Sequence, residues 1–139
     1  MSWTYEITSG KLYSDTGELL DIGYSGQPPH VNDFAAVGEV GIGPIPAGSW
    51  RISGLEWDNP KLGPFVLILE PNEATMAHVI SLNRDPGSFR IHGERVEPPA
   101  GYASDGCLIF PRSIREQIWN SGDHELDTVA TLGGNNEIQ

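Results

Sequence analysis

Residues 103–122, which read ASDGCLIFPRSIREQIWNSG, hold a turn, an apolar strand and a helix in direct succession. Gly106 indicates the turn, and residues 107–110 form an apolar run with the length of a buried strand. Pro111 suits the first turn of a helix, and Gly122 ends the helical pattern. The apolar face of that helix consists of Ile114, Ile118 and Trp119. This stretch therefore predicts a strand followed by one short helix.

Short strands joined by turns account for most of the remaining chain. Alternation of apolar and polar residues over 3–7 predicts a strand, and Asp15-Thr16-Gly17 predicts the turn of a hairpin that ends at Ile22. Residues 23–48 are rich in glycine and proline, which favours an ordered loop over a regular element. Further strands are expected at residues 49–53, 65–69, 77–82, 89–92 and 126–132.

Length and composition agree with one mostly β domain. A chain of 139 residues can bury a sizeable core without disulfides or metals. Its 17 glycines and 11 prolines are spread along the chain, as in proteins built from many short strands. We expect the domain to cover residues 1–132, with residues 133–139 as a flexible tail.

The charge of the chain excludes several kinds of partner. There are 19 acidic and 8 basic residues, which give a formal net charge of -11. Such a protein is repelled by nucleic acids and by anionic membrane surfaces. No apolar stretch is long enough to span a bilayer, and we expect no signal peptide. The four histidines show no metal-ligand spacing, so no metal or other cofactor is expected.

Cys107, the only cysteine, is the candidate nucleophile. A catalytic thiol needs an imidazole and N–H groups that stabilise an oxyanion, and the backbone of Gly106 and Cys107 could supply those N–H groups. His92 is followed by Gly93, whose carbonyl could bind the second ring nitrogen. Taken alone, however, a single cysteine is more often a small buried apolar residue. Spacing does not choose His92 over the other histidines, which are His30, His78 and His124.

The motifs together resemble a known family. Ile91-His92-Gly93, residues 103–109 and Arg112 resemble the active-site stretch of the L,D-transpeptidase catalytic domain. Tyr24-Ser25-Gly26 and the stretch Gly43-Pro44-Ile45-Pro46-Ala47-Gly48, which leads into Trp50, resemble the branch of this superfamily found among type VI secretion effectors. The resemblance runs from Tyr24 to Val129. It implies a mostly β sandwich or barrel with one short helix after the cysteine.

The resemblance also assigns roles to individual residues. It implies that Cys107 is the nucleophile, with His92 as its base. The other assigned residues are Gly93 and Ser104 in the catalytic group, Gly106 and Cys107 in the oxyanion hole, and Arg112, Tyr24 and Ser25 in substrate binding. We interpret Arg84, Arg90 and Arg115 as surface side chains, and Trp50 as a core residue that could also line the groove with Tyr24.

Two departures from the family pattern concern the surroundings of the thiol. Asp105 stands where the superfamily has histidine, and only eleven residues separate His92 from Ser104. The short spacing implies a trimmed loop with residues 98–101 as its rigid apex. Because a nearby carboxylate raises the pKa of a thiol, we expect Asp105 to face away. We also expect the thiolate to form below the usual pKa of ~8.5.

The implied reaction is attack by Cys107 on a peptide carbonyl of the cell-wall stem, next to the diaminopimelate L-centre. A thioester results, which water or an amine resolves, so L,D-carboxypeptidase and L,D-transpeptidase action remain open. The implied partners are peptidoglycan stem peptides, secretion machinery and an immunity protein. The protein would be made in the cytoplasm and would act in the periplasm of a target cell after export, as an antibacterial effector.

Three other functions compete with this interpretation. A papain-type peptidase would use a histidine downstream of the cysteine, here His124, but its cysteine begins a helix rather than a strand. A zinc hydrolase would need His30, His78 and His92, although no two of them come from one element at ligand spacing. A non-catalytic wall-binding or phage structural module could retain the fold without using the thiol.

Overall fold

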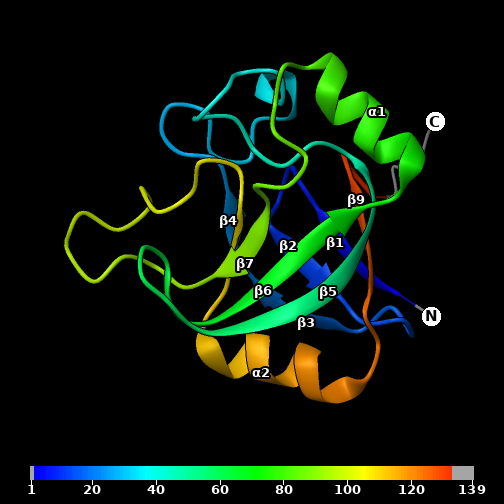
Figure 1. The fold of residues 1–139 in the computed structure, drawn as a ribbon, viewed down its shortest axis with the longest axis vertical. Coiled ribbons are helices and arrows are strands. Elements are labelled where there is room, and N and C mark those ends of the chain that lie inside the picture. Colours follow the sequence, from blue (N-terminus) through cyan, green and yellow to red (C-terminus); the bar gives the residue numbers. More distant parts are fainter. Residues whose placement is uncertain (1, 133–139) are drawn as a thin grey trace.

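The computed structural model describes residues 2–132 of the 139. Within them the chain forms one nine-stranded sheet and two α-helices (Figure 1). The strands are β1 (Trp3–Glu6), β2 (Lys11–Tyr13), β3 (Leu19–Ile22), β4 (Tyr24–Ser25), β5 (Gly48–Asn59), β6 (Gly63–Pro71), β7 (Arg90–His92), β8 (Leu108–Ile109) and β9 (Glu125–Val129). The helices are α1 (Glu73–Ser81) and α2 (Arg112–Ser121), and a 3₁₀ turn covers Phe34–Ala36.

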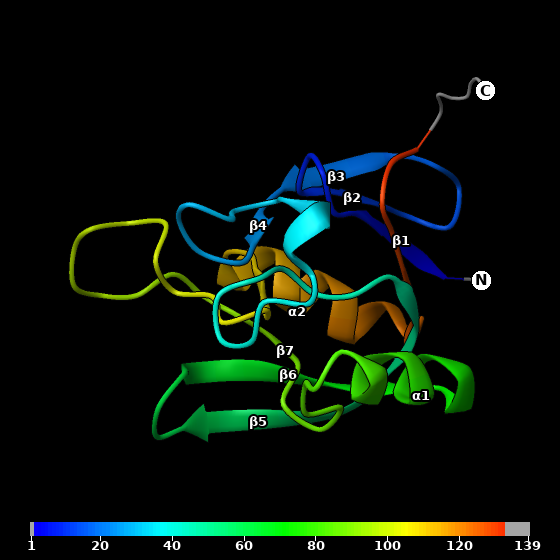
Figure 2. The same ribbon diagram turned by 90° about the horizontal axis from the view of Figure 1, so that it is seen from above.

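The sheet curls until it is nearly a closed barrel. Its strand order is β3-β2-β1-β9-β5-β6-β7-β8-β4, so β3 and β4 form its two edges. Only Gly23 separates these edges along the chain, and this forces them together. A Cβ atom at Gly23 would lie 2.2 Å from the carbonyl oxygen of Ile109, so glycine is required at the seam. Figure 2 shows β1–β3 on one side of the molecule and β5 and β6 on the other.

The parallel pairing of β7 with β8 brings the two motif segments together. Ile91 pairs with Leu108 and His92 pairs with Ile109. Side chains alternate between the two faces of a sheet, and Cys107 lies two residues before Ile109. His92 and Cys107 therefore project to the same face. Cys107 itself immediately precedes β8 instead of belonging to it.

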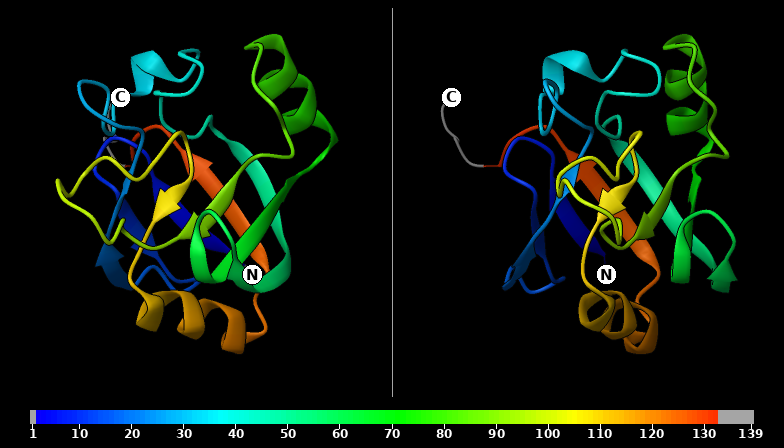
Figure 3. Two further views of the ribbon diagram at one scale, coloured as in Figure 1. Left: turned by 60° about the vertical axis from the view of Figure 1, so that its left-hand side comes forward. Right: turned by 90° about the vertical axis from the view of Figure 1, so that its left-hand side faces the viewer.

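Helix α2 confirms the helix predicted after the cysteine. Ile118 is buried, and Ile114 and Trp119 pack partly buried against the core. The helix ends at Gly122, which adopts the left-handed conformation that favours glycine. Pro111 precedes the first helical residue, where its missing N–H costs nothing. Figure 3 shows α2 and α1 at opposite ends of the barrel.

Residues 77–82, predicted as a strand, lie mostly in helix α1, so the chain has two α-helices within the described residues where one was expected. Asn72 caps this helix by accepting a hydrogen bond from the N–H of Thr75. Thr75 and Val79, four residues apart, form its buried face. The prediction of a strand was wrong because an apolar run of this length fits either element, and Asn72, which caps the helix, lies before the run.

The remaining predicted elements agree with the structure, apart from their bounds. The opening hairpin, the strands at 49–53, 65–69, 89–92 and 126–132, and the long loop 23–48 are all present. The loop contains only the two-residue β4 and the 3₁₀ turn as regular elements. Neither helix is long and apolar enough to cross a bilayer in the part of the chain that is described. The predicted tail, residues 133–139, lies outside the described residues.

Candidate active site

Cys107 and His92 line one cleft. Its inner part, here called the inner cleft, has a volume of about 210 Å³. A wider outer cleft of about 620 Å³ shares five of its lining residues. The inner cleft is lined by Lys61, Leu62, Ser88, Phe89, His92, Ala103, Asp105 and Cys107. The outer cleft adds Gly63, residues 93–97 and Tyr102. The candidate nucleophile and the candidate base thus line the same cleft.

His92 is held in one tautomer by the main chain. Its Nδ1 lies 2.9 Å from the carbonyl oxygen of Gly93, which is the contact expected from sequence. Because a carbonyl oxygen can only accept, Nδ1 carries the proton and Nε2 can accept another. The ring is 3% exposed, and burial lowers its pKa, against the opposing effect of the Gly93 hydrogen bond. The imidazole is therefore neutral near pH 7, the form that acts as a base.

Cys107 is held as a neutral thiol in the unliganded protein. The residue is 8% exposed, and its Sγ donates a long hydrogen bond of 3.7 Å to the carbonyl oxygen of Ser88. Burial raises the pKa of the thiol to about 11, although nearby Arg90 acts to lower it. The structure has no hydrogen bond between Sγ and His92, both of which are described. The expectation of a thiolate below ~8.5 therefore disagrees with the structure, because desolvation outweighs the nearby positive charges.

Ser104 fixes the turn that presents the cysteine. Its Oγ donates to the carbonyl oxygen of Cys107 (2.6 Å) and accepts from the N–H groups of Gly26 (2.8 Å) and Gly106 (3.0 Å). The N–H of Gly106 is thus already engaged and cannot also bind an oxyanion. This corrects half of the expected oxyanion hole. The N–H of Cys107 has no acceptor among the described residues, so it remains available.

Arg84 is buried directly behind this turn, contrary to the expected surface position. Its guanidinium donates to the carbonyl oxygens of Val37, Gly43, Pro44 and Asp105. A Cβ atom at Gly106 would lie 2.2 Å from Arg84 Nη2. Gly106 also has a φ of 132°, which other residues rarely adopt, so glycine is required there for both reasons. Arg84 therefore ties the 37–44 segment to the cysteine turn.

Arg115 was also expected at the surface and is also buried. Its guanidinium donates to the carbonyl oxygens of Pro64, Phe65 and Phe110, which joins α2 to β6. Within residues 2–132, neither Arg84 nor Arg115 has a carboxylate partner. Their acceptors are backbone carbonyl oxygens, which leave no charge pattern in the sequence. Arg90 is half-buried and contacts Glu56 at 3.4 Å.

Two of the three expected substrate-binding residues have other contacts. Arg112 pairs with Glu116 at 2.7 Å, lies over the ring of Phe65 and lines neither part of the cleft. Ser25 is fully buried, where its Oγ donates to the carbonyl oxygen of Gly106 and accepts from the N–H of Ile45. The Ser25 assignment is wrong, because a fully buried hydroxyl cannot reach a ligand in the cleft. The Arg112 assignment stays a prediction, since its side chain is exposed.

Tyr24, the third expected substrate-binding residue, holds the loop between His92 and Ser104 instead of lining the cleft. Its hydroxyl donates to Glu94 Oε2 (2.7 Å) and accepts from the N–H of Ala103 (3.2 Å). The same carboxylate oxygen accepts from the N–H of Gly101 (2.9 Å). Glu94 thus closes the loop that Figure 1 shows projecting from the barrel, with residues 98–101 in its exposed part. Trp50 is a core residue, as interpreted, and its ring lies 5.2 Å from that of Phe89.

Asp105 does not face away from the cleft. It lines both the inner and the outer cleft, and its Oδ1 accepts a hydrogen bond from Gln27 Nε2 (2.8 Å). Its charge contributes to the raised pKa of Cys107, after burial. The same charge opposes the lowering of the His92 pKa, which burial causes. The Asp105 charge therefore favours the protonated thiol, whereas burial is what keeps the imidazole neutral.

The other histidines lie outside the cleft. His30 Nδ1 contacts Asp33 (3.2 Å), His78 is in the last turn of α1, and His124 stacks on Trp119 with ring centroids 4.6 Å apart. The described residues include no group of three or more His, Cys, Asp or Glu side chains that could hold a metal ion. The geometry thus gives no support to the zinc hydrolase or to a papain-type pair with His124.

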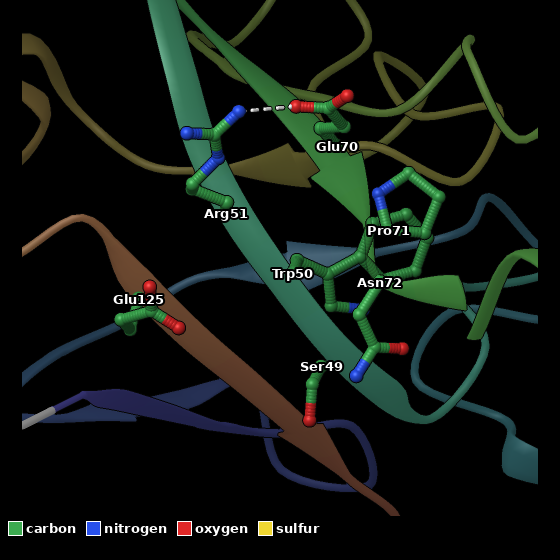
Figure 4. A pocket seen from close by; sticks show the side chains of 7 residues that line it. All are labelled: Ser49, Trp50, Arg51, Glu70, Pro71, Asn72 and Glu125. Atoms are coloured by element: carbon green, nitrogen blue, oxygen red, sulfur yellow. Dashed lines mark hydrogen bonds and ion pairs between the residues drawn. The ribbon is translucent and has the colours of Figure 1, made fainter. Parts of the chain in front are cut away.

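A separate pocket of about 320 Å³ shares no residue with the cleft. Figure 4 shows its lining from β5, β6 and β9, with Arg51 turned toward Glu70. Those two side chains form an ion pair at 2.8 Å, and Trp50 is buried in the core. The pocket contains neither a thiol nor an imidazole, and the hydroxyl of Ser49 donates to Asp127, so this pocket is not a second candidate for the active site.

Comparison with known proteins shows which solved structures have a similar fold. No protein-family model matches the chain, and no curated protein sequence matches it significantly. Among solved structures, the fold is similar to Bd1075 of Bdellovibrio bacteriovorus (TM-score 0.61, 12% identity, 95% of this chain and 48% of that one). It is also similar to an L,D-transpeptidase from Stackebrandtia nassauensis (0.55, 12%, 96% and 57%) and to the catalytic domain of the Enterococcus faecium L,D-transpeptidase (0.54, 14%, 92% and 95%).

These likenesses establish the fold, which is that of L,D-transpeptidase catalytic domains, as the sequence motifs implied. The chain spans 49% of the Enterococcus faecium L,D-transpeptidase and 48% of Bd1075, but 95% of the isolated catalytic domain. At 12–14% identity, the comparison concerns architecture and leaves the chemistry to the residues of this chain.

Proposed function

We propose that this protein is a cysteine-dependent enzyme that acts on peptidoglycan stem peptides, as an L,D-carboxypeptidase or L,D-transpeptidase. One observation carries the proposal. Cys107 lies in the same cleft as His92, and the hydrogen bond from His92 to Gly93 leaves the other ring nitrogen able to accept the thiol proton. The L,D-transpeptidase fold supports the choice of substrate.

The reaction begins with a proton transfer that substrate must induce. At rest the thiol is protonated and the imidazole neutral. As a peptide carbonyl enters the inner cleft, the Cys107 proton passes to His92 Nε2, and Sγ bonds to the carbonyl carbon. The N–H of Cys107 donates to the developing oxyanion. The C–N bond then breaks, and His92 returns the proton to the departing amine, which leaves a thioester on Cys107.

The second half of the reaction decides the product. Water attacking the thioester gives a shortened stem with a free carboxylate, whereas an amine gives a new amide bond. In both cases His92 takes a proton from the attacking group, and the Cys107 thiolate leaves and is reprotonated. Addition of a D-amino acid to the assay separates the two outcomes, because only transfer incorporates it into the stem.

Muropeptide analysis tests the proposal. Purified protein is incubated with disaccharide tetrapeptides, and the products are identified by mass spectrometry. We expect wild-type protein to shorten or exchange the stems, and Cys107→Ala and His92→Ala to lose this activity by at least about 10³-fold. Cys107→Ala should keep the wild-type melting temperature within a few degrees. Unaltered stems with wild-type protein would reject the proposed function and favour a non-catalytic module.

We further propose that the protein acts in the periplasm of a target cell, as an antibacterial effector. The Tyr24-Ser25-Gly26 and 43–48 motifs support this through their resemblance to type VI secretion effectors. Expression of the chain in a Gram-negative host, with and without an added periplasmic leader, provides the test. Lysis should require both the leader and Cys107. Lysis without the leader, or none with it, contradicts periplasmic toxicity, and co-expression of neighbouring genes tests for an immunity protein.

A further inference from the structure

Two charged side chains stand out among the residues of the cleft. Lys61 and Asp105 are the only charged residues that line both its inner and its outer part. Lys61 lies in the turn between β5 and β6, and Asp105 lies in the turn before Cys107. The two residues come from different turns. Both turns line the inner cleft, which Cys107 and His92 also line.

Lys61 has no partner for its charge among residues 2–132. Its only hydrogen bond is made by its main-chain N–H, to Asn59 Oδ1 (2.9 Å). By contrast, Arg51, Arg90 and Arg112 each pair with a carboxylate. A solvated ammonium at the edge of a cleft, in a chain with 19 acidic residues, is free to bind an anionic group of a ligand.

Asp105 also has binding capacity left. Its Oδ1 accepts from Gln27, and its main-chain oxygen accepts from Arg84, but it belongs to no ion pair in the described part of the chain. The other oxygen, Oδ2, has no hydrogen-bond donor there. Glu94 differs, because its oxygens already accept from Tyr24, Arg95 and Gly101. Asp105 is thus the carboxylate of the inner cleft that can accept from a ligand.

The two charges do not neutralise each other. No ion pair joins Lys61 to Asp105, although both line the same space. A ligand that carries one carboxylate and one ammonium satisfies both at once. A ligand with only one of the groups leaves the other side chain without a partner.

We propose that Lys61 and Asp105 determine substrate specificity by binding a free amino-acid head group, with Lys61 holding its carboxylate and Asp105 its ammonium. This deepens the proposed function and rests on it. The substrate class is a peptide with a zwitterionic amino-acid terminus near the bond attacked by Cys107. Both residues bind substrate and neither takes part in the proton transfers.

Four synthetic tetrapeptide stems provide the test. Each contains diaminopimelate, whose distal carboxylate is free or amidated and whose distal amine is free or acetylated. With the doubly free peptide, Lys61→Met and Asp105→Asn should each lower kcat/KM by about tenfold. Lys61→Met should leave the amidated peptide within twofold of wild type. Because the Asp105 charge also affects the pKa of Cys107, Asp105→Asn is judged by the ratio of its rates on the free and the acetylated peptide, which should fall about tenfold relative to wild type. Asparagine keeps an oxygen for the hydrogen bond from Gln27.

The matched controls are Lys11→Met on β2 and Asp15→Asn in the first hairpin, which lie outside the cleft and should change none of the four rates. An equal loss on free and blocked peptides would overturn the proposal. A loss by Lys61→Met that depends on the free amine, or a loss by Asp105→Asn that depends on the free carboxylate, would also overturn it.

Binding separates this inference from the proposed reaction. If wild-type protein converts none of the peptides, the proposed function fails, and titration of the four peptides into Cys107→Ala protein, followed by calorimetry, decides the inference alone. Selective binding of the doubly free peptide, lost in Cys107→Ala/Lys61→Met, sustains the head-group site. Equal binding of all four peptides, or binding of none, rejects it.

Discussion

The two sides of the cleft are held by different kinds of interaction. The turn at residues 104–107 is fixed from inside the protein by three buried side chains: Ser104, Ser25 and Arg84. The loop at residues 93–103 is fixed from outside by Glu94, which is exposed. Buried hydrogen bonds are costly to break, whereas exposed ones compete with water. The thiol therefore sits on the rigid side, and the side facing it can adapt to a ligand.

Among variants of the two sides, loss of Arg84 should have the largest effect on stability, because Arg84 anchors the rigid side of the cleft. Arg84→Met leaves four carbonyl oxygens near the cysteine turn without their donor, and should lower the free energy of unfolding by about 3–4 kcal/mol. Urea denaturation measures the loss. Arg51→Met is the control, because its ion pair with Glu70 is exposed, and it should behave like wild type. A change below about 1 kcal/mol in Arg84→Met would show that the turn is not anchored from behind.

A methyl group at Gly106 tests the same rigid side by crowding. Gly106→Ala places a Cβ against Arg84 and in a backbone conformation that alanine rarely adopts. We expect it to cost about 2–3 kcal/mol of stability. Gly17→Ala is matched, since Gly17 also has a positive φ but nothing within 4 Å of the added Cβ, and it should cost about 1 kcal/mol. Equal losses in the two variants would mean that the contact with Arg84 is relieved easily.

The adaptable side should respond in dynamics more than in stability. Glu94→Ala removes the acceptor for Tyr24 and Gly101, and should lower the free energy of unfolding by at most about 1 kcal/mol. The amide of Gly101 should then exchange with solvent at least about tenfold faster, as measured by NMR. Glu97→Ala, on the same loop, should leave that rate unaltered. Slow exchange at Gly101 in Glu94→Ala would indicate that the loop is ordered by something other than this carboxylate.

Titration of the thiol should give the smallest effect. Burial raises the folded-state pKa of Cys107 to about 11, above its ordinary value, so the stability that comes with the protonated thiol is fully present below that ordinary value. That contribution should disappear as the pH rises through about 11. The stability difference between wild type and Cys107→Ala, measured by denaturation at several pH values, should therefore fall over this range.

Alkylation gives a second measurement of the same property. Iodoacetamide should label the unliganded protein slowly at pH 8 and faster as the pH approaches 11, with unfolded protein labelled readily at pH 8–9. A fast reaction of the folded protein near pH 7 would show that a thiolate already exists without substrate. The proton transfer induced by substrate would then be unnecessary.

Local patterns predicted most of the fold and failed at one helix. Alternation, apolar runs and turn residues were sufficient for the opening hairpin and for β5, β6 and β9, and the helix α2 followed from its apolar face. Helix α1 was missed over residues 77–82, where a short apolar run fits either element. Asn72, its capping residue, was the available signal.

In the candidate site too, contacts between sequence neighbours could be predicted and contacts between distant residues could not. The contact of His92 with Gly93 involves neighbours in sequence, so it could be foreseen. Ser25 and Arg112 were placed at the substrate from their nearness to motifs, yet one is buried and the other pairs with Glu116. Lys61 was not singled out at all, because a single lysine in a hairpin turn carries no signal until the folded chain places it in the cleft that Cys107 also lines.

By itself the sequence determined the class of fold, because strand and helix periodicity is local. It also made Cys107 and His92 the candidate nucleophile and base, through short motifs that resemble a known family. Only the tertiary structure decided the protonation of Cys107, the engagement of the Gly106 N–H and the burial of Arg84 and Arg115. It also decided which charges face the cleft. Desolvation and long-range hydrogen bonds depend on what packs around a group, and residues distant in sequence supply that packing.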